Sequence, residues 1–593
     1  MPQTVQEPQR KINVQRNVRI PMRDGVALAA DLYYPEAPGR FPTLLERTPY
    51  NREESVLHRT HTPEYFASRG YMVVIQDVRG RFGSDGIWFP FIADGWGRLQ
   101  DGYDTVEWLA RHPLSNGRIG TLGGSFAGMT QMLVAPTRPP HLVTCYVREA
   151  ASDLAQQWVY RGGAFELGFN LEWCLRHALP TLAKQVGVIK SALDRKAELY
   201  KEDPLLAHAV IANPHDWLTN ILAHPDNRDD FYAPFDIESQ HHEIDVPMQH
   251  MGGWSDIFLG GTLGNFLGLT KHARTNKARR AQRLMIGPWM HGPPLNTPSF
   301  DRLVGEMDFG SNAMFDLNAD MLRWFDYWLR DESNGVMDSP PVRYFLMGAN
   351  RWCTADAWPP SGAKFLRLHF TRGTGRTNRS LNNGRLTLEK PAGSQPADAF
   401  TYDPRDPVPS IGGNTLHSPP LPPGTPGPQV ADFMAAAGPR DQSSIEPRCL
   451  TYTTEPLAEA VAVVGPVHVV LHASSSAPDT DFVAKLCDVF PDGRSIQVTD
   501  GILRARYRRD RTKPRLLKRA TVYEFAIDLW STAWVFQPSH RLRIVITSSC
   551  FPRFDRNPNT GRSLADSTET RVATNRVFHD RENASHIVLW VIP

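Results

Sequence analysis

The chain has 593 residues, which is too long for one ordinary hydrophobic core, so we expect two to four domains. Hydrophobic residues make up 41% of it and the formal net charge is +2, which excludes a general attraction to nucleic acid or to anionic membranes. Six scattered cysteines lack zinc-type spacing, and no apolar run approaches the ~18 residues of a membrane helix. With a polar N-terminus, a soluble cytoplasmic protein is the simplest interpretation.

The first 151 residues alternate between strand and helix patterns. Apolar residues at every second position on both sides of Asp24 and Gly25 predict a β-hairpin. Further strands are expected at 42–50, 71–80, 117–124 and 141–149, and a helix at 101–112 that Asp101 can cap. Strands that alternate with helices predict a parallel sheet of α/β type.

The remainder of the chain divides into three further parts. Residues 152–243 show helical spacing with few strand signals, so we expect a helical cap inserted over the sheet. Strand patterns return at 245–253 and 282–289, and a helix at 314–330 completes a second α/β part at 244–354. Residues 355–593 hold short β-type runs between turns, which favours a β-sandwich or jelly roll with a proline-rich loop at 417–428.

The stretch RIGTLGGSFAGMTQ, residues 118–131, raises the question of chemistry. Ser125 lies between a strand that ends near Leu122 and a helix that starts near Phe126, which is the context of a nucleophile elbow. Such a turn is tight, so the residues around the serine must be small. The pattern G-x-S-x-G is not met, because Ala127 holds the place of the last glycine. On this motif alone, a purely structural glycine-rich turn stays open.

Two later strand ends supply the partners that a nucleophilic serine needs. A serine hydroxyl requires a histidine that takes its proton and a carboxylate that orients the histidine. In α/β-hydrolases the chain order is serine, acid, histidine, and each follows a strand. Asp256 comes just after one expected strand, and His291 just after the next. The sequence therefore predicts a triad of Ser125, Asp256 and His291.

Other candidates fit this order less well. His241 and His242 precede their strand, and His250 lies within it as a packed core histidine would. Asp77 ends a strand that comes before the serine. The run HHEID at 241–245 is the one candidate for a metal site, and we expect no metal there. The basic run at 504–519 is expected to be a solvated strand pair and loop, without a role in nucleic-acid binding.

An oxyanion hole requires two hydrogen-bond donors near the serine. The backbone N–H of Phe126, at a helix N-terminus, can be the first. No HGGG-type motif supplies the second, but Tyr50 ends an expected strand and its phenol could serve. As an alternative, Tyr50 is an aromatic residue at a structural boundary.

At this point the sequence resembles the CocE/NonD hydrolase family, which contains cocaine esterases, X-Pro dipeptidyl-peptidases and α-amino-acid ester hydrolases. The resemblance runs from about residue 17 to the C-terminus and is closest to the cocaine-esterase branch. The matching motifs are PMRDGVALAADLYYP, RTPY, VVIQDVRGRFGSDG, GGSFAGMTQ, GGWSDIF, GPWMHG, YDPRDPVPSIGG and SSSAPDTDFVAKLCDVFPDGRS. The resemblance implies an α/β-hydrolase domain, a helical cap and a C-terminal jelly roll, which agrees with the domain boundaries predicted above.

The resemblance also implies a role for each candidate residue, without any cofactor or metal. By similarity the roles are Ser125 as nucleophile, His291 as base, Asp256 as orienting acid, Tyr50 and the Phe126 amide as oxyanion hole, and Trp158 and Phe258 as lining of an acyl pocket. For Trp158 and Phe258, ordinary core packing is the alternative.

Three functions stay open on the sequence. The first is a carboxylesterase for a small-molecule ester. The second is an X-Pro dipeptidyl-peptidase or an α-amino-acid ester or β-lactam acylase-type hydrolase, which needs carboxylates for an ammonium group. Ile257 and Phe258 stand where acidic residues follow the triad aspartate in amino-ester hydrolases, and Glu149 and Asp153 are the remaining candidates. The third is a binding module with a vestigial triad. We expect no nucleic-acid or membrane partner, and a homodimer is open.

Overall fold

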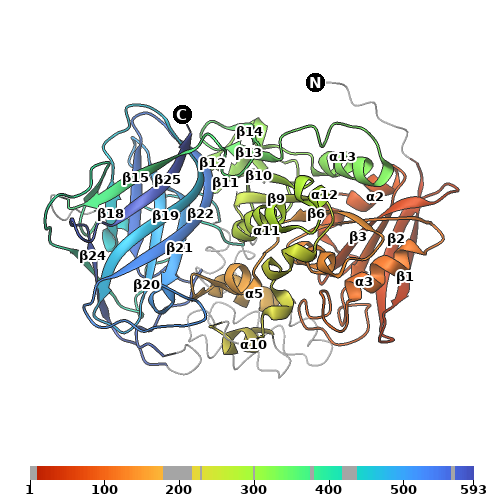
Figure 1. Cartoon of the computed structure of the whole chain (residues 1–593), viewed down its shortest axis with the longest axis horizontal. Helices are drawn as coiled ribbons and strands as arrows, with labels where there is room; N and C mark the ends of the chain where they lie inside the picture. Colours follow the sequence, from red (N-terminus) through yellow and green to blue (C-terminus); the bar gives the residue numbers. More distant parts are fainter. Residues whose placement is uncertain are drawn as a thin grey trace, which may run out of the picture.

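The computed structural model describes residues 10–177, 217–226, 230–297, 301–373, 379–416, 437–562 and 568–592. These residues form an α/β domain, coloured red to green in Figure 1, and a β domain coloured mainly blue. No helix in these ranges is long and apolar enough to cross a membrane. The proline-rich run at 417–428 and the middle of the expected cap, 178–216, lie outside the described residues.

The α/β domain is built on a sheet of ten strands. In spatial order they are β1 (Ile12–Pro21), β2 (Ala27–Pro35), β4 (Met72–Asp77), β3 (Phe41–Thr48), β5 (Ser115–Gly124), β6 (Leu142–Arg148), β9 (Met248–Ser255), β10 (Arg283–Met290), β13 (Val342–Leu346) and β14 (Arg351–Ala355). Neighbours from β4 to β13 pair in parallel, and the pairs at both edges are antiparallel. The predicted mostly parallel sheet is confirmed.

Helices cover both faces of this sheet because its central strands are apolar on both sides. Strand β4 is buried at every position, and its successive side chains enter different core clusters. Val73 packs with side chains of α2 (Thr62–Ala67) and α13 (Leu317–Arg330), whereas Val74 packs with side chains of α3 (Asp101–Ala110) and α4 (Phe126–Val134). The remaining helices of the domain are α1 (Val56–Arg59), α11 (Leu259–His272) and α12 (Asn276–Arg280).

One detail of α3 differs from the sequence prediction. The N-cap residue is Gln100 and makes no side-chain cap, while Asp101 is the first helical residue. The carboxylate of Asp101 is buried and accepts two hydrogen bonds from the Arg79 guanidinium, at 2.8 and 2.6 Å. The predicted capping role of Asp101 is therefore wrong, because a buried arginine competes successfully for its oxygens.

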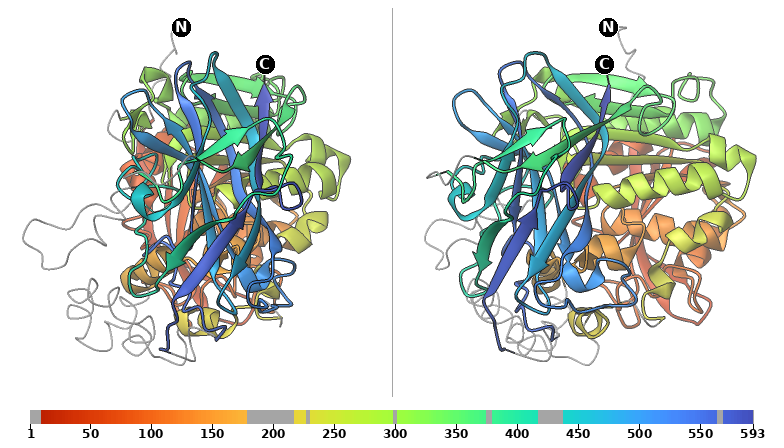
Figure 2. Two further views of the ribbon diagram at one scale, coloured as in Figure 1. Left: turned by 90° about the vertical axis from the view of Figure 1, so that its left-hand side faces the viewer. Right: turned by 60° about the vertical axis from the view of Figure 1, so that its left-hand side comes forward.

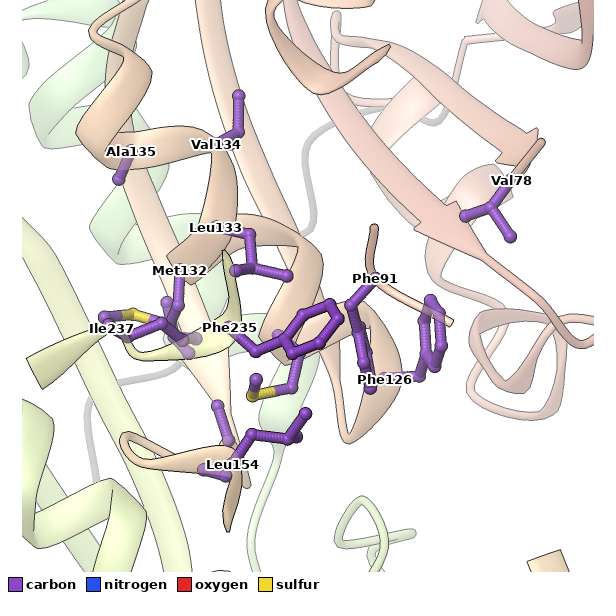
Figure 3. Close-up of a cluster of buried hydrophobic side chains, with 14 of the residues drawn as sticks. Val78, Phe91, Phe126, Met132, Leu133, Val134, Ala135, Leu154, Phe235 and Ile237 are labelled. Carbon is purple, nitrogen blue, oxygen red and sulfur yellow. The ribbon is translucent and has the colours of Figure 1, made fainter. Parts of the chain in front are cut away.

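The segment between β6 and β9 holds the described part of the expected cap. Its elements are the π-helical turn η2 (Ala155–Val159), β7 (Tyr160–Arg161), β8 (Ala164–Phe165), α5 (Leu167–His177), α10 (Trp217–Ala223), and the short turns η3 (Ala233–Phe235) and η4 (Glu238–Glu243). The small β7–β8 hairpin was not expected from the sequence. Figure 3 shows how side chains from this segment, Leu154 and Phe235 among them, gather beside Phe126 and Phe91.

The second domain is a largely antiparallel sheet of eleven strands. Along the main path they are β17 (Asp398–Tyr402), β24 (Ala573–Phe578), β19 (Val461–Ser475), β25 (His586–Ile592), β15 (Lys364–Thr371), β16 (Gly384–Thr387), β18 (Leu450–Thr453), β23 (Arg541–Thr547), β20 (Asp481–Val489) and β21 (Ser495–Arg504), and β22 (Tyr523–Phe536) pairs with β19. The pair β16–β18 is parallel. The predicted all-β domain is confirmed.

One hydrophobic cluster contains residues of both domains. Trp254 and Met290, from the strands that carry two predicted site residues, belong to the same buried cluster as Val463, Ile527 and Trp534 of the β domain. The right-hand view of Figure 2 shows the blue strands beside the first domain. Because this cluster contains residues of both domains, separating the domains would expose apolar surface on both.

The basic run at 504–519 is only partly solvated, contrary to the prediction. Arg504 is buried and makes ion pairs with Asp481 and Asp555, both at distances below 3 Å. Arg506 pairs with Asp479 at 2.7 Å. These arginines stabilise the fold beside the inserted segment, because a buried guanidinium needs carboxylate partners.

Candidate active site

The turn between β5 and α4 holds Ser125 in a strained backbone conformation. Its φ is 58° and its ψ is −123°, a region that side chains other than glycine rarely adopt. A Cβ on Gly128 would lie 2.4 Å from the Arg148 carbonyl oxygen, and a Cβ on Gly123 would lie 2.7 Å from the Ala127 Cβ. Ala127 is therefore tolerated in place of the usual glycine because Gly123 has no side chain.

The structure brings together the three residues that the sequence places in a triad. Asp256 directly follows β9 and His291 directly follows β10, and these strands are parallel neighbours. The Ser125 hydroxyl lies 2.9 Å from Nε2 of His291, and Nδ1 of His291 lies 2.6 Å from an oxygen of Asp256. Asp256 is fully buried and His291 is 9% exposed, so both hydrogen bonds lie in a site shielded from water.

The electrostatic surroundings favour a protonated His291. Burial alone disfavours the imidazolium, but the carboxylates of Asp256 and Glu149 outweigh it and raise the pKa of His291 above its ordinary value of 6.5. A histidine with a raised pKa is a stronger base toward the serine proton. The arrangement can thus accept a proton from Ser125 and stabilise the resulting charge.

Both predicted oxyanion donors lie at the serine. Tyr50 follows β3, and its hydroxyl makes hydrogen bonds with the Ser125 side chain and the Phe126 backbone amide. The indole N–H of Trp173, on α5, donates to the same hydroxyl at 3.2 Å. Burial raises the pKa of Tyr50, so its phenol keeps its proton and can donate it to a developing oxyanion.

Aromatic side chains surround the triad on the side of the inserted segment. Trp158 and Phe258 are fully buried and stack with ring centroids 4.7 Å apart. Phe258 also meets the His291 ring edge-on at 5.2 Å, and Trp173 meets Trp158 at 5.6 Å. The sequence analysis missed Trp173, since nothing in the spacing of α5 shows which of its aromatic residues faces the serine.

The competing residues of the sequence analysis have other partners. His250 is buried and bonded to Gln282, and burial lowers its pKa to about 4, as for a packed core histidine. Asp77 forms an ion pair with Arg52 at 2.6 Å. His241 contacts the Asn265 side chain at 3.2 Å.

In the described part of the chain, the side chains that could together bind a metal ion are not those of the HHEID run. They belong to Glu149, Asp256 and His291, whose potential ligand atoms all lie within 4.8 Å of one another. Both ring nitrogens of His291 already have partners in Ser125 and Asp256. The grouping therefore consists of the acid and the base of the predicted triad, with Glu149 as an additional carboxylate.

The two carboxylates considered for an ammonium site are engaged within the protein. Glu149 follows β6, is 5% exposed, and accepts the Gly292 backbone N–H at 2.9 Å. Asp153 accepts the backbone N–H of Gln156 at 3.1 Å, while Leu154 is the N-cap residue of the η2 turn. Burial raises the pKa of Asp153 to about 6.

The β domain contributes directly to the site through Asn414. This side chain is 3% exposed, and its amide donates to the backbone carbonyls of Trp254 and Asp256, both at 2.9 Å. A residue 158 positions beyond Asp256, the predicted triad acid, therefore holds the turn that carries this acid. Sequence reasoning could not find this contact, because an asparagine in a loop has no periodic pattern.

Two family models match the chain, one in each domain. Residues 24–293 match the X-Pro dipeptidyl-peptidase family S15, and residues 334–588 match the X-Pro dipeptidyl-peptidase C-terminal non-catalytic domain. The first match includes all three residues of the predicted triad.

Curated relatives and solved structures match over nearly the whole length. A cocaine esterase from Rhodococcus sp. (strain MB1 Bresler) is 34% identical, over 98% of this chain and 99% of the relative. An aminopeptidase from a marine sediment archaeon (Thaumarchaeota) superposes with a TM-score of 0.81 at 26% identity, over 99% and 98% of the two chains. An α-amino-acid ester hydrolase superposes at 0.80 with 24% identity, over 100% and 99%, which shows a common fold. With its site geometry and these matches, the chain belongs to the CocE/NonD family of S15-type serine hydrolases.

Proposed function

We propose that the protein is a serine carboxylesterase that cleaves small-molecule esters through an acyl-enzyme. The observation that carries this proposal is the unbroken hydrogen-bond chain from Asp256 through His291 to Ser125, with the Tyr50 hydroxyl beside the nucleophile. In this reaction Ser125 attacks the ester carbonyl while His291 takes its proton. Tyr50 and the Phe126 amide stabilise the tetrahedral anion.

The second half of the reaction uses the same groups. His291 returns the proton to the leaving alcohol, and the acyl group stays on Ser125. Water then attacks the acyl-enzyme while His291 again acts as base, and collapse of the second tetrahedral anion releases the acid. These steps require no cofactor and no metal ion.

An apolar acyl group fits the surroundings of the serine best. Trp158, Phe258 and Trp173 are all buried beside the triad, and aromatic walls favour an aromatic or aliphatic acyl group. The relative named as a cocaine esterase, at 34% identity, supports an ester as substrate. A small ester is therefore the proposed partner, and a homodimer stays a prediction.

Peptidase or amino-ester activity is the second candidate, because solved structures of similar fold include an aminopeptidase. Recognition of an ammonium group requires carboxylates that face the substrate. After Asp256 the chain continues with Ile257 and Phe258, which are both buried apolar residues. Glu149 accepts the backbone N–H of Gly292, the residue after the histidine, and Asp153 accepts the backbone N–H of Gln156. These contacts favour the esterase.

A paired assay separates the two functions. Wild type and Ser125→Ala are compared on p-nitrophenyl butyrate and on Gly-Pro-p-nitroanilide. We expect ester turnover in the wild type, its loss in the variant, and no anilide turnover in either. Strong anilide turnover that depends on Ser125 would support a dipeptidyl-peptidase instead. Wild-type ester activity in the variant would show that Ser125 is a packing residue.

A further inference from the structure

One buried carboxylate beside the triad has no part in the mechanism above. Glu149 lies at the end of β6, the strand next to the one that carries Asp256, so both acids reach the same edge of the sheet. Its backbone has a φ of 50°, which is uncommon for a residue with a long side chain. A strained backbone and a buried acid are both costly, and such features concentrate where a fold serves a function.

The contacts of Glu149 point to the histidine loop. One carboxylate oxygen accepts the N–H of Gly292, the residue directly after the base, at 2.9 Å. Potential ligand atoms of Glu149, Asp256 and His291 lie within 4.8 Å of one another. The other carboxylate oxygen lies 4.0 Å from the Arg148 guanidinium. Glu149 thus contacts the residue that follows His291, while Asp256 contacts the imidazole ring itself.

We propose that Glu149 is a second positioning acid for His291: it fixes the loop through the Gly292 amide and supplies additional negative charge to the imidazolium. This proposal rests on the proposed function, since it assumes that His291 is the base for Ser125.

The groups around Glu149 shift its pKa in both directions. Burial is the main cause that raises its pKa, and the Asp256 carboxylate raises it further, while His291, Arg148 and the Gly292 amide act in the opposite direction. The same carboxylate is one of the groups that raise the pKa of His291. The interaction between acid and imidazole is thus mutual, as linkage between neighbouring charges requires.

The test uses the variant Glu149→Gln, which keeps the acceptor for the loop amide but removes the charge. We would measure kcat/KM for an ester between about pH 5 and about pH 8, where histidine titrates. Without the second charge, the acid limb of the profile moves to lower pH by about one unit, and the maximum falls by up to about tenfold. Asp320→Asn is the control: this partly buried acid accepts a hydrogen bond from Tyr146 and has no triad residue among its hydrogen-bond partners.

A double-variant cycle gives the second readout. In the Asp256→Asn background Glu149 is the remaining carboxylate near the histidine, so its removal should cost at least about tenfold more than in the wild type. An unmoved acid limb together with additive losses would overturn the proposal. Failure of the proposed function itself looks different, because Ser125→Ala would then keep wild-type ester activity.

Discussion

The most informative single change is Asn414→Ala, which removes the hold of the β domain on the triad acid. The side-chain amide donates to the carbonyls of Trp254 and Asp256 at 2.9 Å, on either side of the turn that presents the acid. The substitution deletes both hydrogen bonds and leaves two carbonyls without this donor in a buried site. No charged or catalytic group is touched, so any effect on turnover has to act through the position of Asp256.

The magnitude follows from the number of hydrogen bonds. Each contributes about 0.5–1.5 kcal/mol net, and a buried acceptor left alone costs about 1–3 kcal/mol, so we expect a loss of about 2–4 kcal/mol in the free energy of unfolding. The turn can then shift relative to His291, whose contact with Asp256 is only 2.6 Å long. Misplacement of a catalytic group by about 1 Å costs about a hundredfold in rate, so kcat should fall by about tenfold to a hundredfold.

The assay is ester hydrolysis at a temperature where the variant is still folded, together with unfolding in urea. Asn382→Ala is the matched control, since this buried asparagine donates to Asp398 and accepts the Thr451 N–H within the β domain. It should lose similar stability but keep its kcat. A folded Asn414→Ala variant with wild-type kcat would refute the argument that the β domain positions the acid.

Three further predictions concern the oxyanion hole, the base and the turn that carries the serine. Tyr50→Phe removes one oxyanion donor and should lower kcat by about a hundredfold to a thousandfold with little change in KM, measured by initial rates. His291 must be neutral to act as base, and its pKa is raised. In a pH profile, kcat/KM should therefore fall toward acid pH with a midpoint above pH 6.5. A midpoint below that value would contradict this prediction. Gly128→Ala places a Cβ 2.4 Å from the Arg148 carbonyl oxygen and should destabilise the fold by more than about 2 kcal/mol in thermal unfolding. Gly362→Ala is the control and should be near neutral, because a Cβ there meets nothing within 4 Å.

The triad could be predicted from the sequence because parallel strands all present their carboxyl ends at one edge of the sheet. Ser125, Asp256 and His291 each follow a strand, so their order along the chain already implied that they meet. Tyr50 was found by the same argument, since it also follows a strand that runs parallel to its neighbours.

Residues that reach the site from outside this edge could not be predicted in the same way. Trp173 comes from a helix of the inserted segment, and its direction depends on how that segment folds over the sheet. Asn414 comes from a loop of the other domain, whose position depends on packing between distant parts of the chain. Glu149 was recognised as an acid at a strand end, but its contact with the Gly292 N–H depends on how distant segments of the chain pack together.

Charge pairs in the interior explain the remaining differences. Asp101 has the residue type of an N-cap, and the sequence offers no sign that Arg79 would take its oxygens. Arg504 belongs to a run that looks like a solvated basic face, but its partners Asp481 and Asp555 lie 23 and 51 residues away. Such pairs depend on tertiary contacts, which local patterns do not encode.

The central claim is that Ser125 is the nucleophile and carries the acyl group. The most direct test is to treat the protein with a reactive phosphonate ester, which modifies activated serines, and to locate the adduct by peptide mapping. The account predicts a single adduct on the peptide that contains Ser125, with loss of ester turnover in proportion to labelling, and none in His291→Ala. Labelling at another residue with parallel loss of activity would contradict it.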